Sequence, residues 1–133
     1  MPGRDPGHWL HRLDAAEWLA AAATELAHCA EKLAQRAVRA GVTHARRAAG
    51  MAWNAVLSMA PDEAYGRSYM DHLKALAEDA TVPSPIREAA RALAGAPLES
   101  GLVQLGAGDV HLADLAAAIV AHARDRVKPT ASA

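Results

Sequence analysis

The chain has 133 residues, a formal net charge of −1 and a pI near 6.6. This length fits one domain built around a single hydrophobic core. The nearly neutral charge excludes the strongly basic surface expected of a protein that binds duplex nucleic acid. It does not exclude a local basic patch. Because the sequence contains 35 alanines and no phenylalanine, it favours closely packed helices over sheets.

The cysteine content and the hydropathy pattern indicate in which cellular compartment the protein is expected. Cys29 is the sole cysteine of the sequence, which excludes an internal disulfide and a cysteine-rich zinc site. The first residues carry charges where a signal peptide would be apolar. Every apolar run is interrupted well before the roughly 20 residues that a membrane span requires. We therefore expect a soluble, cytoplasmic protein with no membrane association.

The first predicted helix follows a loose N-terminal arm over about residues 1–13. The tetrapeptide DAAE, residues 14–17, has the form of a capping box, and the helix it begins should extend to Ala40 with Gly41 as its left-handed stop. Three- and four-residue steps define an apolar face that includes Cys29, expected to be an inert core thiol. The polar side is expected to carry Glu17, Glu25, His28, Lys32, Gln35 and Arg39.

A second helix is predicted over the segment HARRAAGMAWNAVLSM. Thr43 is its expected N-terminal cap and Pro61 closes it. Gly50, surrounded by alanines, indicates that another backbone approaches this helix closely.

Two shorter helices follow. Ser68 and Asp71 form a second capping box, and the helix that they begin should span residues 69–80. The fourth helix should begin after Ser84 as its cap and end at Gly95.

The last third of the chain has one unclear stretch and one clear helix. Residues 96–108 predict a connector with one short helical turn, and Asp109 then caps a helix that runs to about Val127. Residues 128–133 predict a frayed tail. The whole pattern predicts an all-α, up-and-down bundle of four main helices plus one short helix, in a single domain over residues 1–133.

Arg67 and His72 form the first candidate catalytic pair, at the start of the third helix. In a metal-independent ribonuclease, an arginine would hold the scissile phosphate while a histidine exchanges a proton. The positive end of the helix dipole would lower the pKa of His72 and leave a neutral base. Since two other Arg-to-His pairs occur with similar spacing, the alternative is that Arg67 is a solvated loop residue and His72 an ordinary first-turn residue.

His44, Arg46 and Arg47 form a candidate binding cluster. This cluster could bind the phosphate backbone of a nucleic acid. The alternative is an exposed first helical turn, although arginine there opposes the helix dipole.

Histidine and carboxylate spacing offers a metal-binding alternative. The steps HLAD and HARD place His111 and His122 on one stripe of the last helix, and ELAH contains His28 three residues after Glu25. A metal-binding bundle would use His28, His111 and His122. Because the His/Asp stripe lies opposite the leucines, a solvated face is the alternative, and we predict no metal site and no cofactor.

The order of helices resembles the HEPN superfamily, small helical-bundle domains found beside nucleotidyltransferases and in toxin–antitoxin systems. AAGMAWNAVL is similar to the alanine-rich second helix of that family, and MDHLKAL is similar to its His-Asp-Leu-like step, with Asp71 and His72 in reversed order. The likeness covers about residues 14–95. Catalytic members carry an Arg-to-His motif near a later helix, whereas here the best match is Arg67 and His72. Non-catalytic members bind partners or dimerise.

Three functions are therefore weighed. The leading one is a non-enzymatic HEPN-like module that dimerises and binds a protein or a nucleotide- or nucleic-acid-related partner. The second is a HEPN-type ribonuclease or toxin using Arg67 and His72, and the third is the metal-binding bundle. Because large apolar side chains are few and many helix faces are lined by alanine, we expect a two-fold symmetric homodimer.

Overall fold

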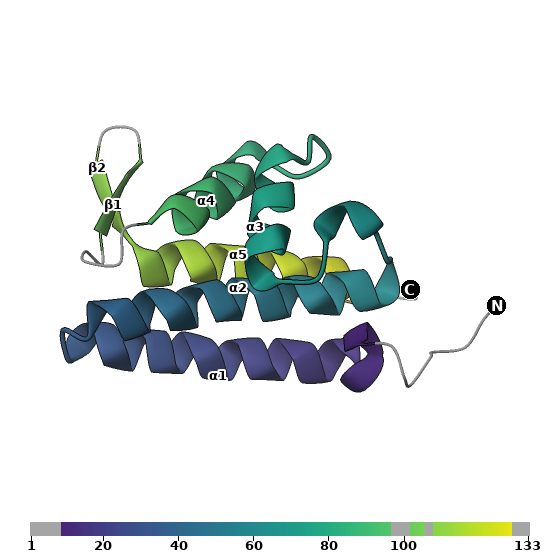
Figure 1. The fold of residues 1–133 in the computed structure, drawn as a ribbon, viewed down its shortest axis with the longest axis horizontal. Coiled ribbons are helices and arrows are strands. Elements are labelled where there is room, and N and C mark those ends of the chain that lie inside the picture. Colours follow the sequence, from purple (N-terminus) through teal and green to yellow (C-terminus); the bar gives the residue numbers. More distant parts are fainter. Residues whose placement is uncertain (1–8, 97–101, 106–107, 129–133) are drawn as a thin grey trace.

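The computed structural model describes residues 9–96, 102–105 and 108–128, and it confirms the predicted all-α bundle of five helices. The elements are η1 (Trp9–Arg12), α1 (Ala15–Ala34), α2 (Val38–Met59), η2 (Glu63–Tyr65), α3 (Tyr69–Glu78), α4 (Ser84–Gly95), β1 (Leu102–Leu105), β2 (Gly108–His111) and α5 (Leu112–Val127). Helices α1 and α2 form an antiparallel pair, α5 packs along α2, and α3 and α4 cover the side opposite α1 (Figure 1).

Both predicted capping boxes are confirmed. The Asp14 carboxylate accepts a hydrogen bond from the Glu17 amide at 2.8 Å, and the Glu17 carboxylate accepts one from the Asp14 amide at 2.9 Å. At the start of α3, the Asp71 amide donates to Ser68 Oγ at 2.9 Å and the Ser68 amide donates to Asp71 at 3.4 Å. These bonds join residues three apart, so they form wherever the local sequence allows them.

The boundary between the first two helices was predicted wrongly. Helix α1 ends at Ala34, and the reversal is made by Arg36, which has a left-handed φ of 62°. Gly41 and Thr43 therefore lie inside α2 and neither stops nor caps a helix. Gly41 serves packing instead, because a Cβ there would lie 2.5 Å from Cδ2 of Leu33. The position of the turn is set by the packing of α1 against α2. Arg36 therefore adopts an unfavourable left-handed φ, although it is not a glycine.

Two later boundaries also differ from the prediction. Pro83, not Ser84, is the residue before α4, and the side chains there make no capping hydrogen bond. Asp109 lies in β2, and His111 precedes α5. The segment predicted as a connector with a helical turn contains a short antiparallel hairpin, in which Leu102 pairs with His111. Its first strand, LVQL, contains one β-branched residue, Val103, of the kind that fits a pleated surface.

Helix α2 is the centre of the fold and is buried along most of its length. It packs against α1, α3, α4 and α5, so its small side chains let several backbones approach. Its largest buried side chain is Trp53, at 2% exposure. The core is completed by Cys29, Leu73, Leu76, Leu93, Leu112 and Ile119, all of them buried.

Part of the predicted N-terminal arm is packed on the bundle. Residues 9–12 form η1, Leu10 is buried, and Trp18 Nε1 donates to the Leu10 carbonyl at 3.0 Å. Residues 1–8 of the arm and 129–133 of the tail lie outside the described part of the chain. None of the described helices is both long and apolar enough to cross a bilayer.

Candidate functional site

His72 lies in the first turn of α3, where the Ser68 capping box fixes the helix start. Its side chain is 1% exposed, and both ring nitrogens have partners. Nδ1 is 2.8 Å from the Tyr65 carbonyl oxygen, and Nε2 is 2.7 Å from Oδ1 of the Asn54 side-chain amide on α2. The ring therefore joins three segments: the turn before α3, α3 itself and the central helix.

The protonation of His72 follows from these partners. Burial lowers the pKa of His72, with the Tyr65 hydrogen bond and Asp71 acting in the opposite direction, so the ring is neutral near pH 7. A carbonyl only accepts, so Nδ1 carries the proton and donates to Tyr65. The structure places Asn54 Oδ1 at Nε2, and a neutral ring satisfies this contact only if the amide is rotated by 180°, so that its nitrogen donates to Nε2. His72 thus holds Asn54 in one orientation.

Asn54 lines a pocket of about 300 Å³ between η1 and the start of α3. The other lining residues are Arg12, Trp18, Arg67, Ser68 and Tyr69. Asn54 is 1% exposed, and within the described part of the chain its amide makes no hydrogen bond besides the one to His72. The amide atom that does not contact His72 is therefore the polar group that Asn54 offers to the pocket.

The two arginines give this pocket its charge. Arg12 and Arg67 are exposed, and neither has a carboxylate within salt-bridge distance among the described residues. Ser68 marks the N-terminus of α3, where amides and the helix dipole favour negative charge. Within the described part of the chain, the pocket therefore offers two guanidinium groups without a carboxylate partner beside a helix start, with Trp18 and Tyr69 contributing aromatic surface.

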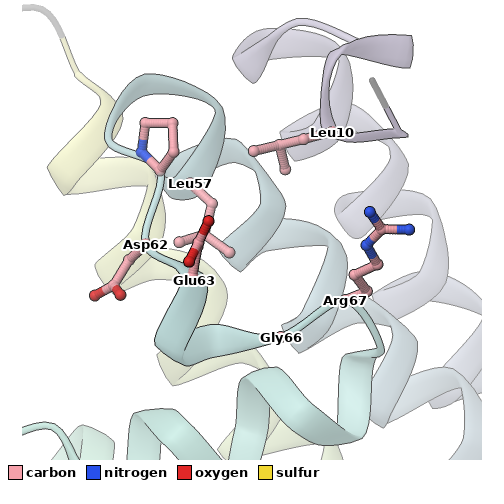
Figure 2. Close-up of a pocket in the computed structure, with 7 residues that line it drawn as sticks. Leu10, Leu57, Asp62, Glu63, Gly66 and Arg67 are labelled. Atoms are coloured by element: carbon pink, nitrogen blue, oxygen red, sulfur yellow. The ribbon is translucent and has the colours of Figure 1, made fainter. Parts of the chain in front are cut away.

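Arg67 also borders a second pocket, of about 370 Å³, which includes Leu10, Leu57, Pro61, Asp62, Glu63 and Gly66 (Figure 2). Figure 2 shows Arg67 on the side of this pocket away from Asp62 and Glu63. Gly66 has a φ of 65°, and a Cβ there would lie 2.7 Å from Asp71 Cβ. This left-handed turn, which favours glycine, brings Arg67 between the two pockets.

The predicted basic cluster is divided by the structure. Arg46 donates to the carbonyl oxygens of Leu93 at 2.9 Å, Ala94 at 3.3 Å and Ala96 at 3.0 Å, at the C-terminal end of α4. It satisfies carbonyls that the helix leaves free and complements the negative end of the dipole. His44 and Arg47 are directed elsewhere, toward α1.

Their partner is Glu25, which the sequence placed wrongly on the polar side of the first helix. Its residue exposure is 5%. Glu25 is seven residues after Trp18 and four before Cys29, both buried, so the helical period puts all three on one face. Arg47 Nε lies 2.6 Å from Glu25 Oε1 as an ion pair without hydrogen-bond alignment, and His44 Nδ1 lies 2.9 Å from Oε2. A buried carboxylate requires such partners.

The histidines of the predicted metal alternative are not brought together. His28 lies beside Glu25, at 3.5 Å, whereas the half-buried His122 stacks on Trp53 with ring centroids 6.0 Å apart. His111 is exposed and is the last residue of β2, before α5, so it does not lie on the last helix as predicted. Burial and Arg126 lower the pKa of His122, which opposes its protonation.

Three groups thus emerge within the described residues: the arginine pocket, the buried Asn54–His72 pair beneath it, and the carboxylate–histidine cluster between α1 and α2. The pocket can bind an anion, and the cluster can hold a cation. No protein-family model, curated protein or solved structure matches the chain.

Proposed function

We propose that the chain is a non-enzymatic, HEPN-like helical module that binds a phosphate-bearing ligand of nucleotide type in the pocket between η1 and α3. The observation that supports this most directly is the approach of Arg12 and Arg67 to one pocket without an acidic partner among the described residues. Unpaired arginines that face a common space repel each other, and an anion between them removes that cost. A nucleotide- or nucleic-acid-related partner is the class that such a pocket fits.

The residues that line the pocket are suited to a ligand that carries both a phosphate and a planar base. Guanidinium forks bind phosphate oxygens through two parallel hydrogen bonds, and the α3 N-terminus adds amide donors. Trp18 and Tyr69 offer aromatic surface on which a base can stack. The Asn54 amide adds a fixed hydrogen-bonding group. A volume of about 300 Å³ admits one nucleotide unit rather than a duplex.

The ribonuclease alternative needs His72 to exchange a proton with its substrate. The ring is 1% exposed, and both nitrogens are engaged with Tyr65 and Asn54. These contacts favour a positioning role for His72 over a catalytic one. The direct comparison is RNA cleavage by the wild type and by His72→Ala, with folding checked in both, and we expect no cleavage that depends on His72.

The binding proposal is tested by titrating the full chain with adenosine monophosphate, inorganic phosphate and a short single-stranded RNA, followed by calorimetry and tryptophan fluorescence. Arg12→Gln and Arg67→Gln should each weaken binding about tenfold, because each removes a charge-assisted contact worth about 1.4 kcal/mol. Arg39→Gln is the matched control, since Arg39 is exposed on α2 and does not line this pocket. Equal affinity of the wild type and the Arg12→Gln/Arg67→Gln double variant would refute the proposal.

Dimerisation through α1 is the second part of the proposal. An exposed stripe on this helix alternates steps of four and three residues and consists of Ala16, Ala20, Ala23, Ala27, Ala30 and Ala34. Small side chains at this period let two helices pack closely, and a two-fold axis would pair the stripe with its own copy. Helix α1 lies along an edge of the bundle, with α2 on one side (Figure 1).

Sedimentation tests this part directly. The wild type should sediment as a dimer at micromolar concentration, and Ala27→Arg should convert it to a monomer. Ala118→Arg, at an exposed alanine of α5, should leave the dimer intact. A monomeric wild type would contradict dimerisation without affecting the ligand proposal. We further propose a cytoplasmic location, where the lone thiol of Cys29 stays reduced.

A further inference from the structure

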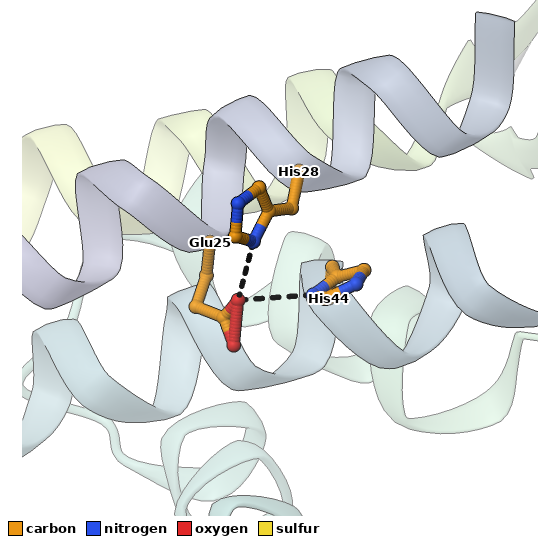
Figure 3. Close-up of side chains that lie close together, drawn as sticks. All are labelled: Glu25, His28 and His44. Carbon is orange, nitrogen blue, oxygen red and sulfur yellow. Dashed lines mark hydrogen bonds and ion pairs between the residues drawn. The ribbon is translucent and has the colours of Figure 1, made fainter.

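We propose a divalent transition-metal site, of the zinc class, formed by Glu25 and His28 of α1 and His44 of α2. Figure 3 shows the two imidazole rings directed at the same carboxylate from neighbouring helices. One ligand atom from each residue lies within 4.8 Å of the others. This group differs from the histidine set that the sequence offered as a metal alternative, and it lies apart from the arginine pocket.

The spacing of the ligand atoms fits tetrahedral zinc. Nδ1 of His44 is 2.9 Å and Nδ1 of His28 is 3.5 Å from Glu25 Oε2. With metal–ligand bonds of about 2.0–2.1 Å, neighbouring ligand atoms of a tetrahedral site lie about 3.3 Å apart. The two observed separations lie on either side of that value. The third separation, between the ligand atoms of the two histidines, is within 4.8 Å, so rotation of the two rings toward each other would bring all three ligand atoms to the spacing that an ion requires.

The chemistry of the donors fits the same class of metal. Two imidazole nitrogens and one carboxylate oxygen are a ligand set that Zn²⁺ accepts, with the fourth position left for water. Binding requires the Nδ1 lone pairs, so each ring would carry its proton on Nε2. In the structure, Nδ1 of His44 hydrogen-bonds to Oε2 at 2.9 Å. The ion would take the place of that bonding proton.

The three candidate ligands differ in their exposure to solvent. The Glu25 side chain is 7% exposed, that of His44 20% and that of His28 50%, so an ion can enter from solvent and reach a buried carboxylate. Arg47 contacts the other carboxylate oxygen, Oε1, at 2.6 Å and leaves Oε2 to the histidines. It orients the ligand from outside the coordination sphere. Its positive charge also opposes a second cation, so the affinity should be lower than that of a four-ligand structural site.

Occupancy of this site would tie α1 to α2. His28 and Glu25 come from one helix of the antiparallel pair and His44 comes from the other, so a bound ion adds a cross-link that the unfolded chain lacks. A ligand that binds the folded state alone raises stability as its concentration exceeds its dissociation constant. Zinc should therefore protect the chain against thermal unfolding.

The experiment is a zinc titration of the full chain, purified without a metal-affinity tag, in competition with a chromophoric chelator. We expect one zinc ion per chain, at least a tenfold loss of affinity in His28→Ala and in His44→Ala, and a zinc-dependent rise in melting temperature in the wild type alone. Co²⁺ should give the intense visible absorption of a tetrahedral complex. His111→Ala is the matched control, because His111 is exposed and lies outside the cluster, and it should bind zinc as the wild type does.

His28→Ala keeps the test independent of folding, because this side chain is half exposed and circular dichroism can verify the helical content. The proposal is overturned if the wild type binds zinc no more tightly than His28→Ala. Undiminished stoichiometric binding by the His28→Ala/His44→Ala double variant would also overturn it, because other side chains would then hold the ion. Arg67→Gln should keep the zinc affinity, so failure of this proposal and failure of the phosphate proposal are distinguishable.

Discussion

Replacing Gly50 with alanine should destabilise the fold, although alanine is the better helix former. Gly50 is buried within α2, and a Cβ there would lie 2.3 Å from Cδ1, 2.4 Å from Cγ and 2.5 Å from Cβ of Tyr69. The gain in helix propensity is about 1 kcal/mol. Overpacking costs about 1–3 kcal/mol, and the upper end applies here because Tyr69 Cβ is fixed to the start of α3. We expect the free energy of unfolding to fall by about 1–2 kcal/mol.

Two other helical glycines provide matched comparisons. A Cβ at Gly95 would meet nothing within 4 Å, so Gly95→Ala should stabilise the chain by about 0.4–1 kcal/mol. A Cβ at Gly41 would lie 2.5 Å from Cδ2 of Leu33. Because the end of a half-buried leucine can rotate away, Gly41→Ala should cost less than Gly50→Ala.

The assay is urea denaturation followed by far-UV circular dichroism, with the three variants and the wild type compared at one temperature. The slope of the free energy of unfolding against urea concentration should be the same in all four proteins, since each change leaves the surface exposed on unfolding nearly constant. A Gly50→Ala variant as stable as the wild type, or more stable, would refute the close packing of α2 against the start of α3. A destabilised Gly95→Ala would instead refute the reasoning from helix propensity.

Three further changes test other contacts. Burial lowers the pKa of His72, so below about pH 6.5 the unfolded chain binds its proton before the folded chain does, and stability should fall by up to about 1.4 kcal/mol per pH unit. His72→Gln should flatten that slope in urea melts between about pH 7 and pH 5, and an unchanged slope would exclude His72 as its source. Tyr65→Phe removes the hydroxyl that donates to Asp79 and should cost about 1–2 kcal/mol by thermal melting. A loss within error would mean that water replaces this bond. Glu25→Ala leaves Arg47 without its carboxylate and should cost about 1–3 kcal/mol, since Arg47 is half exposed and water compensates part of the loss. Full wild-type stability of Glu25→Ala in the same melts would show that the buried carboxylate contributes nothing.

The sequence by itself determined the presence and order of the five helices and the two capping boxes, whereas the other predicted caps were wrong. The Asp14 and Ser68 boxes depend on hydrogen bonds between residues three apart, and the helical period put Cys29 in the core. Such features follow from local geometry, so they can be read before any tertiary contact is known. Glu25 was within reach of the same reasoning, because its position relative to Cys29 already assigned it to the buried face, against the preference of a carboxylate for water.

Tertiary structure decided the reversal between α1 and α2 and the composition of both candidate sites. A left-handed Arg36 makes the turn because the two helices must meet, and Gly41 is small because Leu33 occupies its side-chain space. Arg67 and His72 are close in sequence, yet one is exposed and the other buried. The arginine that shares the pocket with Arg67 is Arg12, from η1. Spacing along the chain cannot identify such partners, because the contacts exist only once distant helices have packed.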